Sequence, residues 1–174
     1  PVTRYPKTPK GVTNFNWEVC IVKQRVVLSV VLMATFLWIA NASADTAQDC
    51  RSLVERAVSM FKDQDKAAAL KAIDSKTGPF VNGDLYVFAI TTTDNVVLAH
   101  PYEKTLKRMK MENFKDSNGK HFFKEFREVA VNGGSGWVEY TWAKPGTKEA
   151  SPKRAYIMKV PGEDIYVGSG YYLK

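Results

Sequence analysis

The first clear pattern is a set of apolar residues that recur every three or four positions between residues 45 and 75. Such spacing places apolar side chains on one face of an α-helix. Gly78 and Pro79 follow the pattern and terminate it. We therefore expect one long amphipathic helix, whose apolar face consists of Leu53, Val54, Ala57, Val58, Phe61, Ala68, Leu70 and Ile73.

The rest of the chain has the shorter period of β-strands. Segment 85–92 is rich in β-branched and aromatic residues and is apolar on both faces, so we expect a central strand covered on both sides. Segment 96–99 returns as its hairpin partner after a turn at residues 94–95. We expect a short amphipathic helix over 120–131 and further strands over 136–142, 154–160 and 165–171.

This order of elements indicates the fold class. Runs of strands joined by short turns form an antiparallel sheet, and the helices must cover its apolar faces. We therefore predict an α+β protein with one sheet in one domain.

Residues 22–44 have the layout of a secretory signal peptide. Basic residues precede an apolar run over 26–40, and the small residues of Asn41-Ala-Ser-Ala44 follow it. The run is shorter than the about 20 residues of a membrane span. We therefore favour cleavage after Ala44, which makes the mature protein periplasmic or secreted, over an uncleaved membrane anchor.

The segment before the signal peptide is a separate question. Val22 is a candidate for the true start, read from a non-standard codon. Residues 1–21 are then an artefact of the gene model or a disordered leader, which suits their prolines and scattered polar residues. This division leaves residues 45–174 as the folded domain.

Charge argues against a nucleic-acid partner once the leader is set aside. The whole chain has a net charge of +7. Residues 1–44 hold five of its 25 basic and one of its 18 acidic residues, so 20 basic and 17 acidic residues remain, a net charge of +3. Charges of mixed sign are typical of a solvated surface, and we expect no binding of nucleic acid.

Cysteine usage points to neither a disulfide nor a metal. Cys20 lies in the leader, and so Cys50 has no internal partner and should be a partly buried thiol on the first helix. No Cys/His spacing typical of a metal or haem site occurs, and we expect no metal and no cofactor.

Four segments in the same order resemble a single Cache domain, a PAS-like extracytoplasmic sensor module. They read GPFVNGDLYVFAITTTDNVVLAHP, FKDSNGKHFFKEF, GSGWVEYTW and SPKRAYIMKVPGEDIYVGSGYY, and the resemblance covers about residues 46–174. It implies a long N-terminal helix on a five- to six-stranded antiparallel PAS-like sheet, with a pocket for a small ligand on the other face. Short carboxylates and amino acids are the ligands that the resemblance implies.

The resemblance also implies partners. Cache domains are commonly the sensing part of chemoreceptors and sensor kinases. The sequence ends at Lys174, directly after the last expected strand. We therefore expect a freestanding sensor whose output passes through a separate membrane receptor or kinase. A homodimer through the N-terminal helix is a further possibility.

His100 is one of only two histidines and follows an apolar strand in NVVLAHPY. Pro101 biases it toward an extended conformation. The resemblance places it near the pocket, where an imidazole could donate to a carboxylate. A structural role at the strand end is an equal alternative. Catalysis is the weakest reading, because no nucleophile or orienting carboxylate accompanies it.

Lys153, Arg154 and Tyr156 are the candidates for binding an anion. A buried carboxylate needs a cation and directional donors. In a regular strand Tyr156 shares a face with Arg154 and not with Lys153. Either Pro152 bends the start of the strand, or Arg154 is the cation. A solvated basic edge is the structural alternative for all three.

Aromatic side chains complete the candidate site. Trp137 and Tyr140 lie on the expected strand 136–142, and alternation puts Trp137 on the other face from Tyr140 and Trp142. Tyr86 and Phe88 lie on the expected central strand. One set could line a pocket while the other fills the core. Gly168 and Gly170 suggest close approach of a helix or a ligand.

These observations favour a sensor domain that binds a small organic acid or a similar metabolite, most plausibly a short-chain carboxylate. One alternative is a structural or protein-interaction module with a vestigial pocket. Another is a membrane-anchored sensor fragment, if residues 22–42 are retained. We expect no enzyme, because the sequence contains no catalytic constellation.

Overall fold

The computed structural model describes residues 46–174, so the predicted leader and signal peptide lie outside the described residues. The described part of the chain starts with a helix over 46–63, which is followed by α2 (Lys66–Ile73). The later elements are β1 (Val81–Asn82), β2 (Leu85–Thr91), β3 (Val97–Ala99), the 3₁₀ turn η1 (Lys104–Leu106), α3 (Phe122–Gly133), β4 (Ser135–Ala143), β5 (Ala150–Lys159) and β6 (Ile165–Tyr172).

The strands form one six-stranded antiparallel sheet, which confirms the predicted α+β class. Its order is β1-β2-β6-β5-β4, and β3 pairs with β2 beyond this path. The last strand of the chain, β6, therefore lies between β2 and β5. The hairpin predicted from 85–92 and 96–99 is present as the β2–β3 pair.

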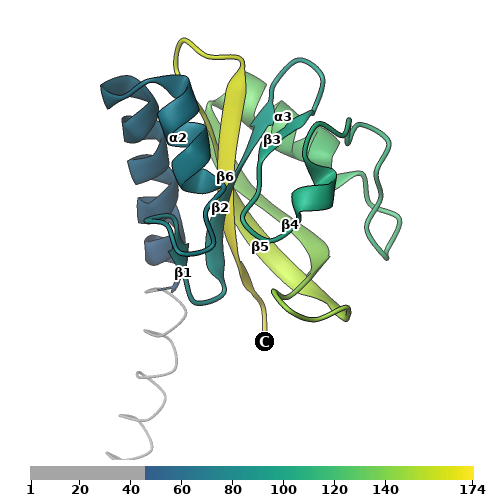
Figure 1. The fold of residues 1–174 in the computed structure, drawn as a ribbon. Helices are drawn as coiled ribbons and strands as arrows, with labels where there is room; N and C mark the ends of the chain where they lie inside the picture. Colours follow the sequence, from purple (N-terminus) through teal and green to yellow (C-terminus); the bar gives the residue numbers. More distant parts are fainter. Residues whose placement is uncertain (1–45) are drawn as a thin grey trace, which may run out of the picture. The chain divides into compact units, whose positions relative to one another are not determined.

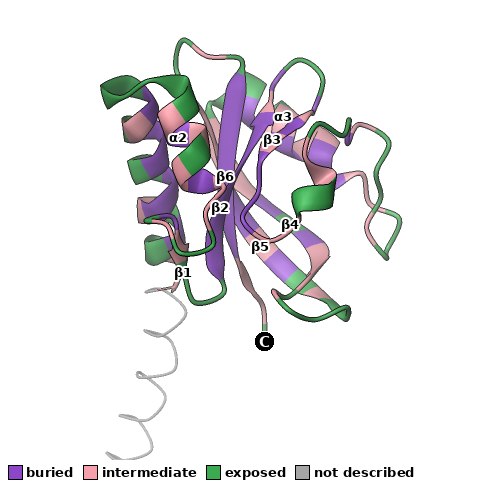
Figure 2. Ribbon diagram, viewed as in Figure 1, coloured by how far each residue is buried: buried purple, intermediate pink, exposed green. Residues whose placement is uncertain are grey.

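Helices cover the sheet on two sides (Figure 1). The N-terminal helix and α2 lie on one face, and α3 lies on the other. Side chains of β2 alternate between them: Val87 and Ala89 contact the N-terminal helix cluster, whereas Tyr86, Phe88 and Ile90 face α3. Strand β2 is thus central and covered on both faces, as its apolar sequence predicts, and β2 and β6 are buried along most of their length (Figure 2).

The prediction of one continuous helix over 45–75 is wrong. The helix stops after residue 63, and α2 (Lys66–Ile73) starts anew at Asp65. The Asp65 carboxylate accepts hydrogen bonds from the backbone N–H groups of Ala67 and Ala68, at 2.7 and 3.0 Å. This N-cap changes the helix direction, because the capping residue adopts an extended conformation. The residues of α2 that are buried are Ala69 and Ile73, rather than Ala68 and Leu70.

Strand β5 begins at Ala150, four positions before the predicted start at 154. Its pairing with β4 continues without interruption from Ser135 with Met158 to Ala143 with Ala150. The loop that joins β4 and β5 is consequently shorter than expected. Cross-strand pairing extends the strand through Pro152 and Ser151, whose sequence alone favours a loop.

Cys50 lies on the N-terminal helix, as predicted, but it is fully buried. Its thiol donates a hydrogen bond to the backbone carbonyl of Ser169 on β6, at 2.9 Å. Burial raises the pKa of this thiol.

Two glycines of β6 leave room for atoms of the neighbouring strands on the face of the sheet that α3 covers. A Cβ at Gly168 would lie 2.5 Å from Phe88 Cζ and 2.6 Å from Ile157 Cδ1. A Cβ at Gly170 would lie 2.7 Å from the Arg154 carbonyl oxygen. Side chains of β2 and β5 therefore meet over Gly168, whereas the close neighbours of Gly170 lie on β5 alone.

We expect Gly168→Ala to lower the free energy of unfolding by about 1–3 kcal/mol, the usual cost of overpacking a core. Gly133→Ala is the matched control, because a Cβ at this helical position has no neighbour within 4 Å. It should be neutral or stabilise by about 0.5–1 kcal/mol. Urea denaturation of the two variants measures the difference. Equal stability of both variants would contradict a close approach at Gly168.

Candidate functional site

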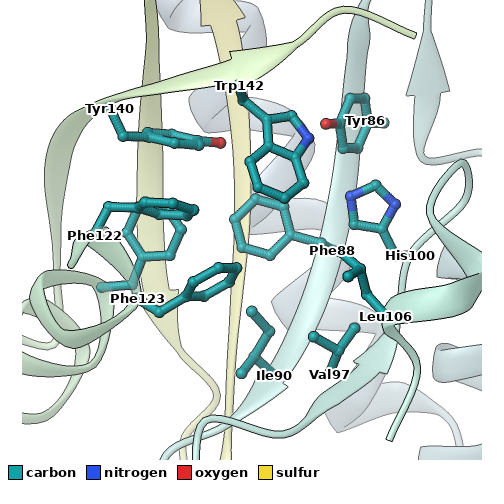
Figure 3. Close-up of a pocket in the computed structure, with 11 residues that line it drawn as sticks. Tyr86, Phe88, Ile90, Val97, His100, Leu106, Phe122, Phe123, Tyr140 and Trp142 are labelled. Carbon is teal, nitrogen blue, oxygen red and sulfur yellow. The ribbon is translucent and has the colours of Figure 1, made fainter. Parts of the chain in front are cut away.

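An aromatic cavity lies between α3 and the sheet (Figure 3). The space open to the centre of a water-sized sphere is about 20 Å³, little more than one water molecule requires. Side chains therefore nearly fill the cavity. Its lining comes from β2, β3, η1, α3, β4 and the segment after β3, namely Tyr86, Phe88, Ile90, Val97, His100, Leu106, Phe122, Phe123, Phe126, Tyr140 and Trp142.

His100 combines two of the roles considered from the sequence. Its Nδ1 accepts hydrogen bonds from the backbone N–H groups of Tyr102 and Glu103, at 3.2 and 2.9 Å. These bonds organise the loop that follows β3. An acceptor at Nδ1 places the proton of the neutral ring on Nε2, and His100 also lines the cavity. The imidazole thus shapes the loop and contributes an N–H donor.

Electrostatics keep His100 neutral. Burial, followed by the positive charges of Lys153 and Lys104, lowers its pKa to about 3. Only Asp74 acts in the opposite direction. Asp74 also accepts the backbone N–H of His100 at 3.3 Å and forms ion pairs with Lys104 and Lys107, at 2.9 and 3.0 Å. The loop that carries His100 is therefore tied to the end of α2.

Lys153 is the most unusual charged residue near the cavity. It has 0% exposure, and its Nζ has no hydrogen-bond partner among residues 46–174. Nζ lies 3.9 Å from the ring centroid of Tyr86 and 4.7 Å from that of Tyr172. Cation–π contact offsets part of the cost of burying the ammonium. Burial lowers the pKa of Lys153 to about 7, so the amine is half protonated at neutral pH.

The structure shows which residues of β5 face each side of the sheet. Strand β5 pairs in regular register with both neighbours, and Pro152 does not change the alternation. Lys153 therefore lies on the α3 side of the sheet. Arg154 and Tyr156 lie on the N-terminal helix side with Trp137, where Arg154 Cζ is 5.1 Å from the Trp137 ring centroid and the Trp137 and Tyr156 rings are 5.1 Å apart.

The candidate residues thus divide into two groups. His100, Tyr86, Phe88 and Tyr140 line the cavity. Lys153 lies beside this group over the Tyr86 ring. Trp137, Arg154 and Tyr156 lie on the opposite face of the sheet, and so we leave them out of the proposed pocket.

Sequence reasoning left several lining residues out of the candidate set. Phe122, Phe123 and Phe126 lie in the amphipathic helix predicted over 120–131, and their helical spacing could have indicated a pocket wall. Leu106 comes from a segment expected to be polar and irregular, where no sequence signal marks it. The cavity gathers such residues because η1 and α3 close over the same face of β2.

Within residues 46–174, no group of three or more His, Cys, Asp or Glu side chains is arranged to hold a metal ion. No helix in this part of the chain is long and apolar enough to cross a membrane.

The sequence model of the Cache domain family matches residues 40–174, and the chain belongs to this family. The match confirms the resemblance noted in the sequence. It includes the last five residues of the predicted signal peptide, which lie outside the described residues.

Solved structures with the same fold include three chemosensory domains. A periplasmic sensor domain of a chemotaxis protein is 26% identical with a TM-score of 0.63, over 78% of this chain and 98% of that one. A Cache chemosensory domain studied for carboxylic acid recognition is 22% identical, with a TM-score of 0.67, over 77% and 97%. A methyl-accepting chemotaxis protein from Vibrio parahaemolyticus is 21% identical, with a TM-score of 0.64, over 76% and 91%.

The burial of the Lys153 amine predicts how the stability of the protein depends on pH. The pKa of this amine is about 7 in the folded protein against 10.5 for an ordinary lysine. Between these values the unfolded chain binds a proton that the folded chain lacks, so this residue's contribution to stability improves as the pH rises. Lys153→Met should be more stable than wild type at pH 7 by about 1 kcal/mol or more.

The advantage of Lys153→Met should shrink by roughly 1 kcal/mol per pH unit between pH 7 and 9. Urea denaturation across this range measures it. Lys159→Met is the control, because the Lys159 amine donates to the Glu163 carbonyl at 3.0 Å. If the difference in unfolding free energy between Lys153→Met and wild type did not change with pH, the Lys153 amine would be solvated.

Proposed function

We propose that the domain is an extracytoplasmic sensor that binds a short-chain monocarboxylate in the cavity under α3. The observation that carries this proposal is the Lys153 ammonium, which is fully buried beside the cavity and has no hydrogen-bond partner within the described part of the chain. A buried cation without a counter-ion is costly. An anionic ligand would supply the missing partner and be held by it.

The polar groups near Lys153 suit a carboxylate. The Nε2–H of His100 and the hydroxyl of Tyr140 would supply directional donors, because burial raises the pKa of Tyr140 and keeps it protonated. The Tyr86 hydroxyl already interacts with Tyr172. The rings of Phe88 and Phe122 would surround an apolar tail. No acidic side chain lines the cavity, so the ammonium group of an amino acid would lack a partner. The small free space limits the proposal to acids of acetate to pyruvate size, and even these would need lining side chains to move.

The cellular context is part of the proposal. A periplasmic or secreted location after cleavage behind Ala44 suits a family in which a periplasmic sensor domain of a chemotaxis protein has the same fold. Output would pass through a separate membrane receptor or kinase. A homodimer through the N-terminal helix stays a prediction, since the exposed positions of this helix carry polar and charged side chains such as Gln48, Glu55 and Arg56.

A second candidate, an interaction module with a vestigial pocket, is favoured by one observation. The free space of about 20 Å³ is small for a ligand site, because ligand pockets usually enclose hundreds of cubic ångströms. A carboxylate would have to displace side chains such as Leu106 or Trp142 to enter. Ligand binding therefore decides between the two candidates.

We expect acetate, propionate or pyruvate to raise the melting temperature by mass action. Lys153→Met should weaken binding about tenfold or more, because it removes a charge-assisted hydrogen bond. Arg154→Met is the matched control, since its side chain leaves the same strand on the opposite face, and it should bind like wild type. A thermal-shift titration followed by calorimetry measures both.

A flat thermal response to the whole panel of acids would contradict the sensor and support the vestigial pocket. Equal weakening by Lys153→Met and Arg154→Met would contradict the assignment of Lys153 as the cation.

Affinity should also depend on pH. Small carboxylic acids stay ionised above pH 6, whereas Lys153 loses its proton around pH 7. Because the anion binds the protonated amine, affinity should be highest below pH 7 and fall by up to about tenfold per pH unit above it. Calorimetry from pH 6 to 9 measures this slope. Constant affinity over the whole range would argue against an ion pair with Lys153.

A further inference from the structure

The neutral form of Lys153 has the properties of a nucleophile. Its Nζ is fully buried, makes no hydrogen bond within residues 46–174 and lies over the rings of Tyr86 and Tyr172. An unprotonated amine has a free lone pair, and desolvation in an apolar site is how proteins make lysine nucleophilic. Burial keeps about half of these amines neutral at pH 7, whereas a solvated lysine is neutral on the order of a thousandfold less often.

The amine lies next to the cavity. Tyr86, whose ring centroid is 3.9 Å from Nζ, lines the cavity. Tyr140, the cross-strand partner of Lys153 on β4, lines it as well. On β6, Tyr172 is the cross-strand partner of Lys153, and Gly170, the partner of Ala155, has no side chain beside it. Lys153 itself does not line the cavity, so a small molecule there would reach the amine past the Tyr86 ring.

We propose that Lys153 is a covalent attachment site, at which its amine forms a reversible imine with the carbonyl carbon of a small 2-oxo acid. This inference rests on the proposed function, because it uses the same pocket and the same carboxylate recognition. It adds a ligand class, acids with a carbonyl beside the carboxylate, that a simple ion pair would not distinguish from other small acids.

The reaction balances without any further reagent. The Nζ lone pair attacks the carbonyl carbon, a C–N bond forms, and the carbonyl oxygen takes up the proton that the nitrogen releases. The resulting carbinolamine loses its hydroxyl group together with the remaining N–H proton as water, and C=N replaces C=O. The imine nitrogen then takes up a proton from the solvent. No oxidant or reductant takes part, and addition of water reverses the step.

The protonated imine preserves the electrostatics of the site. It carries a positive charge at the position of the lysine ammonium, directly beside the carboxylate of the attached acid. The Nε2–H of His100 is a further donor on the cavity wall for that carboxylate. An aldehyde without a carboxylate would lack this stabilisation, which favours 2-oxo acids as the ligand class.

Reductive trapping tests the proposal on the intact chain. The protein is incubated with pyruvate and cyanoborohydride at pH 7.5, and peptide mass spectrometry maps the reduced adducts. We expect adduct on Lys153 at least about tenfold faster than on any other lysine. It should disappear in Lys153→Met, persist in Lys159→Met and be suppressed by excess propionate. Propionate itself, which has no ketone or aldehyde carbonyl beside its carboxylate, should give no adduct.

Mapping on the wild-type protein keeps the test decisive even if Lys153→Met does not fold. Thermal stabilisation by propionate with an unmodified Lys153 would overturn the covalent step alone and leave the proposed function standing. An unmodified Lys153 without any stabilisation by propionate would overturn both. Adduct on Lys153 without stabilisation by propionate would support the imine and overturn the proposed ion pair with simple monocarboxylates.

Discussion

Strict alternation of side chains across a sheet covered on both faces is the constraint on which the rest of this structure depends. Each residue of β2, β5 and β6 must face either the N-terminal helix or α3, because regular antiparallel pairing leaves no other direction. The same constraint puts Lys153 on the pocket side and Arg154 on the helix side. It also puts Gly168 and Gly170 on the pocket side, where side chains of β2 and β5 meet over Gly168.

Burial of one amine then sets the chemistry of the pocket. Lys153 faces a wall of aromatic rings without a counter-ion among the described residues, and this arrangement lowers its own pKa and contributes to the low pKa of His100. A single position thus shifts with pH between a cation, which suits carboxylates, and a free amine, which suits carbonyl carbons. Binding sites often contain an unpaired buried charge that lowers the stability of the free protein. A ligand of opposite charge can restore this stability when it binds.

Much of the candidate site could be predicted because strands carry a local signal. Tyr86, Phe88 and Tyr140 lie on segments whose alternation is visible in the sequence, and His100 follows one of them. The β5 residues could not be placed in advance, since the phase of alternation at Pro152 depends on pairing with β4 and β6. Leu106 was missed because η1 lies in a polar segment without periodicity.

The sequence by itself determined the kinds and order of the elements, the α+β class and the Cache family, because periodicity, turn residues and motif order are local properties of the chain. Only the tertiary structure decided which faces meet. It broke the first helix at Asp65, extended β5 to Ala150 and separated Lys153 from Tyr156. The outcomes on β5 depend on pairing between residues far apart in the chain, for which no local pattern contains the information. The break at Asp65 uses a local N-cap, which the apolar periodicity of the segment does not reveal.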